Sequence, residues 1–545
     1  MDYFEAVSRL HLLHGISFIV YWLVGVLLAA ALSLVAAASL IVIPAALIRI
    51  HQAPKNIPWA GLQNKKWFPK LRACLREMAV GRAAVEEGYE KYGKHGKAFI
   101  IPGLHWNAVV LPPSHSDWVA RQPENVLSSN KVLDDTMGLQ WLVHGPTASS
   151  VRDFTVLRRD MTRQHIKLSH HILDEIKHAF DEELGSGTEY HKVSASNLCA
   201  KISFRATNRM FVGLPLCRSE AYETDVTRWT TAFGTCTLIM RFLIPKSLKP
   251  LFMQFVALPT KLVQWRAVRF IRPRIRQRLG VLKHDKTLGN SLENVQKEKE
   301  PNDMLQWIIN ANAAKDNPRE LEPGNIAGKM LFFNVFATGT TSTVFALILC
   351  DMVSHVDATA LIVQLREEAD QYMPLIMEDG SAARHMMKTD SVIRETLRHN
   401  PMGAQGLLRE VVAPSGLTTP DGLHLPKGTH VQSVVSGMQR DVNIGGAGVD
   451  EYDPLRYWRE AQRGEVSKQL SASQVSDRFL SFGLGKHACP GRFFAVNSIK
   501  LMLGHLLMTY DIEPLKAKPE YTVIGEGLIP SAKTMVRLRR RSFTT

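Results

Sequence analysis

The chain has 545 residues, of which 45% are hydrophobic and 21% are charged, so it can bury a large core and is not a disordered protein. Lysine and arginine outnumber aspartate and glutamate by 66 to 51, which gives a net charge of +15. Such an excess suits an anionic membrane surface or an acidic protein partner. The basic residues are spread along the chain rather than alternating with aromatic residues, so we expect no nucleic-acid partner.

Residues 16–48 contain no charged side chain, and this run exceeds the roughly 20 apolar residues that a membrane-spanning helix needs. A cleaved signal peptide would have a much shorter apolar region. We therefore predict a single transmembrane anchor over residues 16–50. Residues 51–68, which contain two prolines, are predicted to form a linker.

The distribution of charge around the anchor predicts its orientation. Arg9 is the only Lys or Arg before the apolar run, whereas several basic residues follow it closely. By the positive-inside rule, residues 1–15 are lumenal and residues 69–545 form a cytosolic domain. The six cysteines are scattered without a C-x-x-C pair, which fits a reducing compartment and gives no indication of a zinc site.

After the linker, residues 69–92 have apolar positions at helical spacing, and residues 98–101 and 109–111 are typical of two short β-strands. Residues 124–150 are polar and irregular, which favours a loop or short helices over a pocket. Residues 154–180 are predicted to form one helix with several basic side chains. These are Arg158, Arg159, Arg163 and Lys167.

The second half of the chain contains a long uncharged stretch. Residues 283–302, before it, are charged and polar, which predicts an exposed linker. Residues 330–353 carry no charge until Asp351 and are long enough for a second membrane span. Asparagine and several threonines interrupt them, among them Thr340 and Thr341, and polar groups are costly in lipid. We therefore favour a helix buried in the core of a large domain.

Farther on, Glu395 and Arg398 stand three residues apart, so they share one face of a predicted helix. By themselves they are equally consistent with an exposed ion pair of little energetic consequence.

A glycine-rich loop, Phe482 to Gly491, precedes an apolar helical run and contains one cysteine, Cys489. Glycines permit a tight turn that brings backbone amides close to a neighbouring group. Amide donors and the start of a helix stabilise a thiolate, and a thiolate is one of the ligands by which proteins hold haem iron. The alternative is a buried structural cysteine, the usual fate of a free cysteine.

The spacing F-x-x-G-x-x-x-C-x-G resembles the haem-binding loop of the cytochrome P450 family, and residues 87–113 and 200–218 are similar to segments of its fungal members. The resemblance implies a mainly α fold with a small β-region, preceded by the anchor, and a haem b with Cys489 as axial ligand. It also places other residues at the haem, His487 and Arg409 as partners of the propionates. The full set is Phe482, Gly485, His487, Cys489, Gly491 and Arg409.

The resemblance assigns roles to the other motifs as well. Thr341 aligns with the threonine that hydrogen-bonds iron-bound dioxygen in the family, and Thr340 stands where an acid usually precedes it. A hydroxyl organises water but is a poor proton source. Arg456 is implied to join Glu395 and Arg398 in a buried structural cluster beneath the haem. One basic residue of the 154–180 helix is implied to meet a propionate.

Residues 232–262 are rich in Phe, Leu, Met and Pro, and they fit either a core segment or, by analogy with the family, a mobile lid near the membrane. This choice stays open at the level of sequence.

The implied activity is insertion of one oxygen atom from dioxygen into a hydrophobic small molecule, by hydroxylation, epoxidation or several oxidation steps. Likeness to fungal members points to a terpenoid or polyketide-type intermediate of secondary metabolism. Electrons would come from NADPH through a reductase in the endoplasmic reticulum membrane, with cytochrome b5 as a second donor. The alternatives are a haem-thiolate isomerase or dehydratase, which only Thr340 supports, and a non-enzymatic membrane-anchored haem protein.

Overall fold

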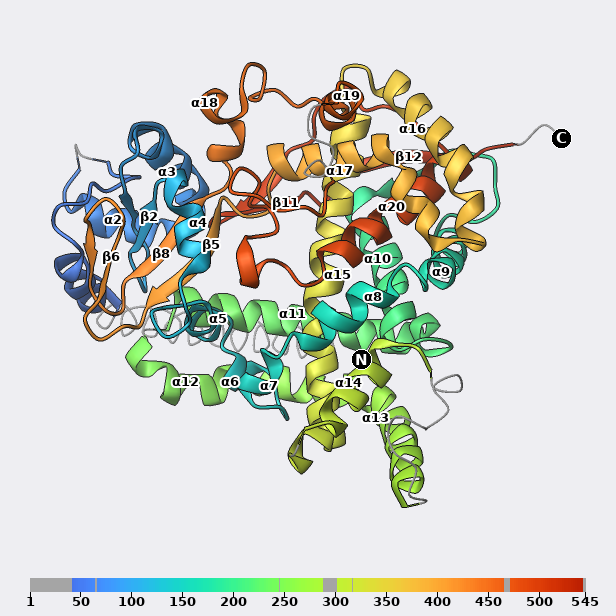
Figure 1. Ribbon diagram of the computed structural model, residues 1–545, viewed down its shortest axis with the longest axis horizontal. Coiled ribbons are helices and arrows are strands. Elements are labelled where there is room, and N and C mark those ends of the chain that lie inside the picture. The colour runs from blue at the N-terminus through green and yellow to red at the C-terminus, as the bar shows by residue number, and fades with distance from the viewer. Residues whose placement is uncertain are drawn as a thin grey trace, which may run out of the picture.

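The structure, a computed structural model, describes residues 42–63, 66–244, 246–287, 301–315, 317–464 and 471–542. Helices make up most of it and surround the long helix α15 (Pro323–Val353), while the largest sheet lies to one side, beside α3 (Glu77–Lys91) (Figure 1). The prediction of a mainly helical fold with a small β-region is confirmed.

The other α-helices are α2 (Pro69–Leu75), α4 (Ser116–Arg121), α5 (Ser129–Met137), α6 (Leu139–Leu142), α7 (Ala148–Val151), α8 (Thr162–Gln164), α9 (Ser169–Leu184), α10 (Ala195–Phe211), α11 (Glu220–Phe242), α12 (Lys249–Val256), α13 (Leu258–Thr287), α14 (Met304–Ala313), α16 (Ala358–Tyr372), α17 (Met387–His399), α18 (Val442–Gly445), α19 (Arg456–Gln462) and α20 (Arg492–Thr509).

The strands are β1 (Phe99–Ile101), β2 (Ala108–Leu111), β3 (Leu127–Ser128), β4 (His191–Ser194), β5 (Gln405–Val411), β6 (Leu417–Thr418), β7 (His424–Leu425), β8 (His430–Val434), β9 (Tyr510–Ile512), β10 (Tyr521–Ile524), β11 (Gly527–Pro530) and β12 (Met535–Arg540). The predicted strands at 98–101 and 109–111 are β1 and β2, which pair antiparallel.

The largest sheet has the strand order β1-β2-β8-β5-β3. The pairing of β2 with β8 is parallel, and the other pairings are antiparallel. Between Gly406 and Arg409 the strand β5 contains one residue more than β8 opposite it, and Leu407 adopts a φ of 51°. A β-bulge of this kind redirects the side chains that follow it.

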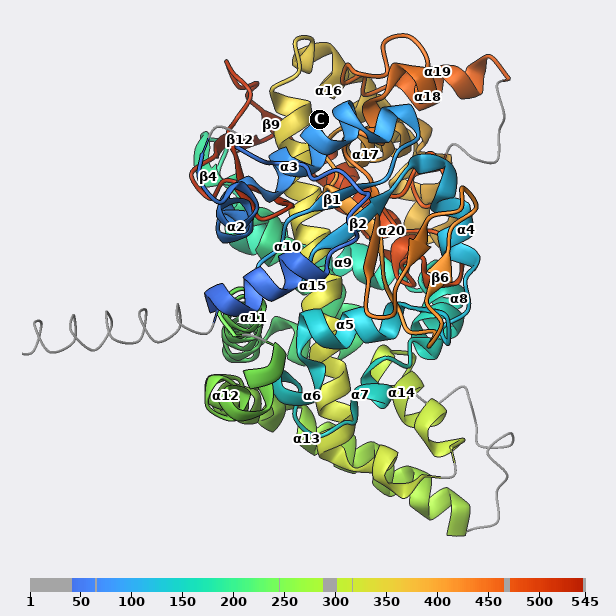
Figure 2. The ribbon, with the colours of Figure 1, turned by 90° about the vertical axis from the view of Figure 1, so that its left-hand side faces the viewer.

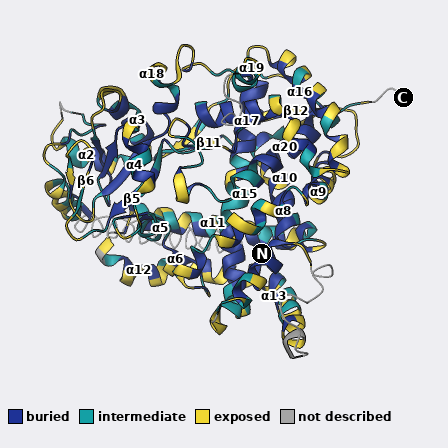
Figure 3. Ribbon diagram, in the orientation of Figure 1, coloured by how far each residue is buried: buried dark blue, intermediate teal, exposed yellow. Residues whose placement is uncertain are grey.

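The apolar side chains form two buried clusters. The smaller cluster lies on the sheet, where α3 contributes Tyr89 and the strands contribute Phe99, Val110 and Val431. The larger cluster unites the helices around α15. Buried residues run along both bodies, and exposed ones gather at their outer faces (Figure 3). The sheet body and the helical body therefore each have a core.

Within the described residues, α15 is the one helix long and apolar enough to cross a membrane. It packs instead against α10, α13, α16, α17 and α20 at the centre of the molecule (Figures 1 and 2). Its segments 326–334 and 344–353 are buried throughout. The interpretation of residues 330–353 as a core helix is confirmed.

The N-terminal predictions fall largely outside this part of the chain, because the described residues begin at 42. Residues 42–52 are helical and lie beside α11 (Figure 2). The segment 1–15 and most of the anchor predicted at 16–50 are not among the described residues. The sequence predicts an exposed linker at 283–302, but helix α13 continues to Thr287 and occupies its first part. Residues 288–300 are again outside the described ranges.

The prediction of a single helix over residues 154–180 is wrong. The chain forms a π-helical turn at Leu157–Met161, the short α8 and a turn, and only then the regular helix α9. Side chains interfere with the regular backbone ladder here. Thr162 Oγ1 donates to the carbonyl of Leu157 at 3.2 Å, and His165 Nδ1 lies 2.9 Å from the carbonyl of Thr162. Such local bonds compete with helical ones.

Residues 232–262 are partly core and partly surface. Phe233, Met240 and Met253 are buried, whereas the outer face from the end of α11 to the start of α13 exposes large apolar side chains (Figure 3). We call this face the apolar strip. It consists of Leu243, Leu251, Phe252, Phe255, Leu258, Leu262 and Trp265.

The contact between α3 and the sheet leads to a stability prediction. A Cβ added at Gly88 would lie 2.2 Å from Cε2 of Phe99 and 2.8 Å from Cβ of Ala60. We expect Gly88→Ala to lower the free energy of unfolding by about 1–3 kcal/mol, because the core there is already filled. Denaturant unfolding measures this.

Gly234→Ala on α11 is the control, since a Cβ at that position meets nothing within 4 Å. It is expected to raise stability by up to about 1 kcal/mol through helix propensity. Equal stability of the Gly88→Ala protein and the wild type would contradict the close approach of α3 to β1.

Candidate active site

The cysteine loop, residues 482–491, leads directly into α20. Its backbone closes on itself, because the amide of Cys489 donates to the carbonyl of Phe482 at 2.8 Å. Arg492, at the start of α20, donates from Nη1 to the carbonyl of Cys489 at 2.9 Å. The loop is therefore held in shape from both ends.

Gly485 is required where the loop meets α4. It has a φ of 66°, and a Cβ there would lie 3.2 Å from the carbonyl oxygen of Ala120. Both the left-handed backbone and the close contact favour glycine. Gly491 is also closely approached, since a Cβ would lie 3.1 Å from the methyl carbon of Met161.

The surroundings of Cys489 act on its thiol in two directions. Burial raises its pKa, while the amides of Gly491 and Arg492 and the Arg492 guanidinium act to lower it. An anionic sulfur here has donors and a cation beside it but little solvent. A bound metal cation would compensate the negative charge of the sulfur, because a thiol that coordinates a metal is deprotonated.

A cluster of charged groups lies beside the loop. Arg409 follows the β-bulge of β5 and is buried; its Nη1 donates to the carbonyl of Leu408 at 2.8 Å, and its Nη2 has no partner in the part of the chain that the structure describes. Burial lowers the pKa of Arg409 to about 10, and the charge of Glu124 opposes this. A buried guanidinium with a free N–H is suited to an anionic ligand.

His487 connects this cluster to the loop. Burial lowers its pKa to about 4, and the charges of Arg409, Lys486 and Arg158 act in the same direction. The neutral imidazole therefore donates from Nε2 to Glu124 Oε1, 2.9 Å away. The structure thus brings together two of the predicted residues, Arg409 and His487, and adds Arg158.

Arg158 is the basic residue of the 154–180 segment that the structure places near His487. Arg159, by contrast, forms an ion pair with its neighbour Asp160 at 2.8 Å. Glu124 was missed in the sequence. It accepts hydrogen bonds from Ser128 Oγ and from the first two backbone amides of α5, and no local motif marks it.

The two threonines lie at the centre of α15, which packs against α20 (Figure 1). Thr341 is buried, whereas Thr340 is exposed although it lies in the middle of a core helix. Residues 335–339 are only half-buried. Side chains thus leave the middle turns of α15 uncovered on one side. Thr340 Oγ1 donates to the carbonyl of Phe336 at 2.6 Å, so its proton is engaged within the helix.

Glu395 and Arg398 form a buried pair, which the half-buried Arg456 extends to a cluster. Glu395 is fully buried, and Arg398 meets both its oxygens at 2.7 Å, from Nε and Nη2. Arg456 Nε lies 3.4 Å from Glu395 Oε1. The pair on α17 is therefore not an exposed one.

The cluster also reaches the cysteine loop through Gln439, another residue that the sequence did not reveal. Arg398 Nη1 donates to the carbonyl of Gln439 at 2.7 Å. The Gln439 side chain donates to the carbonyl of Arg398 at 3.1 Å and accepts from the amide of Leu480 at 2.9 Å. The segment that enters the loop is thus tied to α17.

Comparison with known proteins agrees with this geometry. The family model of cytochrome P450 matches residues 144–536. Cytochrome P450 monooxygenase polB of Polytolypa hystricis is 30% identical, over 90% of this chain and 94% of its own length. Cytochrome P450 monooxygenase gloP of Glarea lozoyensis is also 30% identical, over 89% of this chain and 90% of its own. Cytochrome P450 monooxygenase lnaC of Aspergillus flavus is 29% identical, over 86% and 89%.

The chain therefore belongs to the cytochrome P450 family, and it is an enzyme of the monooxygenase class. The family implies a haem iron held by a cysteine thiolate. The residues present fit such a group, because the half-buried Cys489 has amide donors, and the buried Arg409, which acts on His487 of the same loop, has an N–H without a partner among the described residues.

The buried cluster generates a prediction. Glu395→Gln leaves Arg398 buried without its anionic partner, so we expect a loss of about 3–5 kcal/mol in the free energy of unfolding. Chemical denaturation followed by circular dichroism measures it. Glu90→Gln is the matched control, since Glu90 forms an exposed pair with Lys94 at 2.7 Å. That change should cost less than about 1 kcal/mol, and similar losses in both variants would contradict the cluster's importance.

Proposed function

We propose that this chain is a membrane-anchored haem-thiolate monooxygenase that inserts one oxygen atom from dioxygen into a hydrophobic small molecule, with Cys489 as the residue whose thiolate would hold the haem iron. The observation that carries the proposal is the environment of Cys489, a desolvated sulfur with two backbone amides and Arg492 acting on it. Haem bound there supplies oxygen activation, and the thiolate favours O–O cleavage. The protein supplies position and protons.

The cationic cluster would hold the haem carboxylates. The free Nη2 of Arg409 is the donor best placed by its burial to receive a carboxylate, and Arg158 and His487 lie nearby. Phe482, Gly485 and Gly491 would shape the loop around the ligand. Glu124 would fix His487, because the acceptor at 2.9 Å determines which ring nitrogen carries the proton.

On α15, Thr341 would offer its hydroxyl to dioxygen, and Thr340 would organise water. Because the Thr340 hydroxyl donates its hydrogen bond to the carbonyl of Phe336, only its lone pairs remain free, and they can accept hydrogen bonds from water. Proton delivery would then pass through ordered water rather than an acid at this position.

Electron supply and location follow the family pattern. Lys486 and Arg158 are exposed near the loop, and such a basic surface suits the acidic face of an NADPH-dependent reductase or cytochrome b5. The apolar strip and the uncharged run at 16–48 support attachment to the endoplasmic reticulum membrane, with residues 69–545 as the cytosolic catalytic domain. Likeness to fungal enzymes supports a terpenoid or polyketide-type substrate of secondary metabolism.

A second candidate, an isomerase or dehydratase without net oxygen insertion, is favoured only by Thr340 in the place of the usual acid. Expression with a reductase, followed by product analysis on hydrophobic precursors, distinguishes the two. A monooxygenase consumes NADPH and dioxygen in step with product. Turnover that requires neither would refute the proposal.

The ligand assignment predicts the outcome of one substitution. Cys489→Ala should abolish the thiolate-type Soret band of the reduced, carbon-monoxide-treated protein, because no other ligand replaces the thiolate. The control is Cys236→Ala, at a buried cysteine on α11 whose Sγ donates to the carbonyl of Val256 at 3.1 Å. It should retain the band. Survival of the band in Cys489→Ala would mean that another residue binds the iron.

The role of Thr341 is tested by the amount of product formed per NADPH consumed. Thr341→Val removes the hydroxyl and keeps the shape, so we expect this ratio to fall about tenfold or more. Thr343→Val is the control on the same helix, since Thr343 Oγ1 only donates to the carbonyl of Gly339 at 2.9 Å. Equal ratios in the two variants would remove Thr341 from the proton path.

A further inference from the structure

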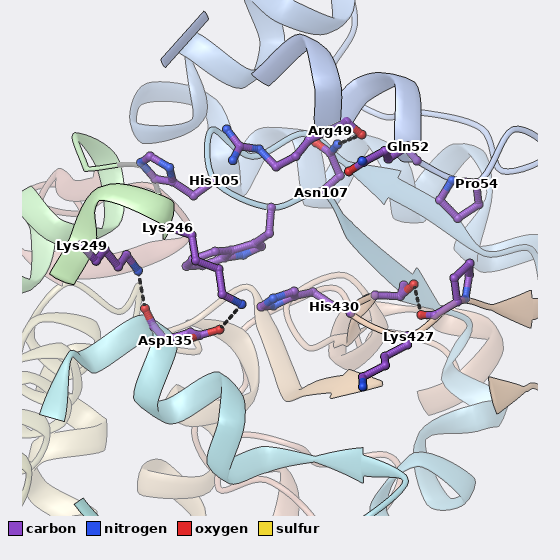
Figure 4. A pocket seen from close by; sticks show the side chains of 15 residues that line it. Arg49, Gln52, Pro54, His105, Asn107, Asp135, Lys246, Lys249, Lys427 and His430 are labelled. Carbon is purple, nitrogen blue, oxygen red and sulfur yellow. Dashed lines mark hydrogen bonds and ion pairs between the residues drawn. The ribbon is translucent and has the colours of Figure 1, made fainter. Parts of the chain in front are cut away.

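A cavity of about 320 Å³ lies away from the cysteine loop, at the junction of five segments. These are the end of the helix at 42–52, the chain before β2, the helix α5, the start of α12 and the turn between β7 and β8. Figure 4 shows the side chains that line it, several of them basic. The basic ones are Arg49, His105, Lys246, Lys249, Lys427 and His430.

The positive charge of this basic pocket is only partly compensated. Asp135 pairs with Lys246 at 2.8 Å, and its carbonyl accepts from Lys249 Nζ at 2.9 Å (Figure 4). A second carboxylate, Glu410 at the base of the pocket, lies 3.4 Å from His430. Arg49 Nη2 donates to the carbonyl of Leu104, but its buried Nε has no partner within the described ranges. Lys427 is exposed and has no acidic partner among the described residues.

Cations are crowded into the pocket at an energetic cost. Burial lowers the pKa of Lys249 to about 8, and the charges of Lys246 and Lys131 act in the same direction, against that of Asp135. Lys249 is also held beside the ring of Trp106, 6.0 Å from its centroid. A bound anion would relieve this crowding, because an opposite charge nearby favours the protonated amine.

A metal ion does not explain the cluster at the base of the pocket. Ligand atoms of Asp135, Glu410 and His430 lie within 4.8 Å of one another. However, the ammonium of Lys246 already lies among them, 2.8 Å from Asp135 and 4.0 Å from Glu410. The lysine supplies the positive charge that a metal ion would bring.

Exposed apolar residues on both sides of the basic pocket indicate the kind of surface against which it lies. On one side, Leu47 and Ile48 are 44% and 56% exposed on the helix at 42–52, at the end of the uncharged run. On the other side, α12 exposes Leu251 and Phe252 of the apolar strip. Basic residues between two apolar surfaces are typical of the level of lipid phosphates at a membrane.

We propose that the basic pocket binds the phosphate group of an anionic phospholipid at the membrane surface. Arg49, Lys249 and Lys427 donate to the phosphate from three sides, and Lys246 remains paired with Asp135. This inference rests on the proposed membrane attachment and adds a specific lipid site to it. The bound lipid fixes the end of the anchor helix against α12 and the β7–β8 turn.

The test uses full-length holoenzyme in uncharged detergent and isothermal titration calorimetry. The probes are dioctanoyl phosphatidic acid, dioctanoyl phosphatidylcholine and inorganic phosphate. Phosphatidic acid should bind at one site about tenfold more tightly than phosphatidylcholine, with an affinity that falls as salt rises. Equal affinity for the two lipids overturns the proposal. If inorganic phosphate binds as tightly as phosphatidic acid, the pocket recognises free phosphate and not the phosphate group of a lipid.

Four variants locate the site. Lys427→Gln, at an exposed position, and Lys249→Gln/Lys427→Gln should weaken phosphatidic acid binding, the double variant about tenfold or more. Lys516→Gln/Lys533→Gln removes the same charge from exposed positions outside the pocket lining and should bind as the wild type does. Asp135→Asn should tighten binding, because it removes one of the two carboxylates at the pocket and releases Lys246 from its closest ion pair.

The Soret spectrum and the unfolding midpoint show whether each variant is folded. Wild-type affinity in Lys427→Gln together with weaker binding in Asp135→Asn would overturn the proposal. Flotation of the full chain with phosphatidylcholine vesicles tests membrane attachment separately. A chain that fails to float refutes the anchor, whereas one that floats but shows no preference for phosphatidic acid refutes only the pocket.

Discussion

The buried ion pair between Glu395 and Arg398 is the interaction on which the arrangement of the site depends. Each group makes several bonds besides the pair itself: Glu395 accepts from the amide of Asp453 at 2.8 Å, and Arg398 donates to three backbone carbonyls. Two desolvated charges are costly unless their remaining hydrogen-bond donors and acceptors also find partners in this way. The pair therefore determines the path of the chain from residue 439 to Arg456, and through Gln439 it reaches the cysteine loop.

The cysteine loop and the cationic cluster contain charged groups whose charges are compensated only when another group is bound. Cys489 is a potential anion in a place with little water, and Arg409 is a cation in a similar place. Neither neutralises the other directly. A haem, with a cationic iron and anionic carboxylates, matches both, so the free energy of binding would come from charges that the fold has already desolvated.

Local patterns were sufficient to predict the core helix at 330–353, the strands β1 and β2 and the cysteine loop, because spacing and hydrophobicity determine these features within a short stretch. The break before α9 was not predictable from periodicity, since it depends on Thr162 and His165 bonding to backbone carbonyls. Glu124 and Gln439 escaped notice for a different reason. Their partners, His487 and Leu480, are far away in the sequence, and only the folded chain brings them together.

The β-bulge in β5 has a consequence for two sites at once. Adjacent residues of a strand point to opposite faces, so Arg409 is directed to the cysteine loop and Glu410 to the basic pocket, where it lies 3.4 Å from His430. Because β5 contains one extra residue before them, both orientations depend on the bulge. If the same residues paired with β8 without the bulge, Arg409 and Glu410 would exchange faces, leaving an acid near the thiolate and an arginine among lysines. One inserted residue thus sets the sign of the charge on both sides of the sheet.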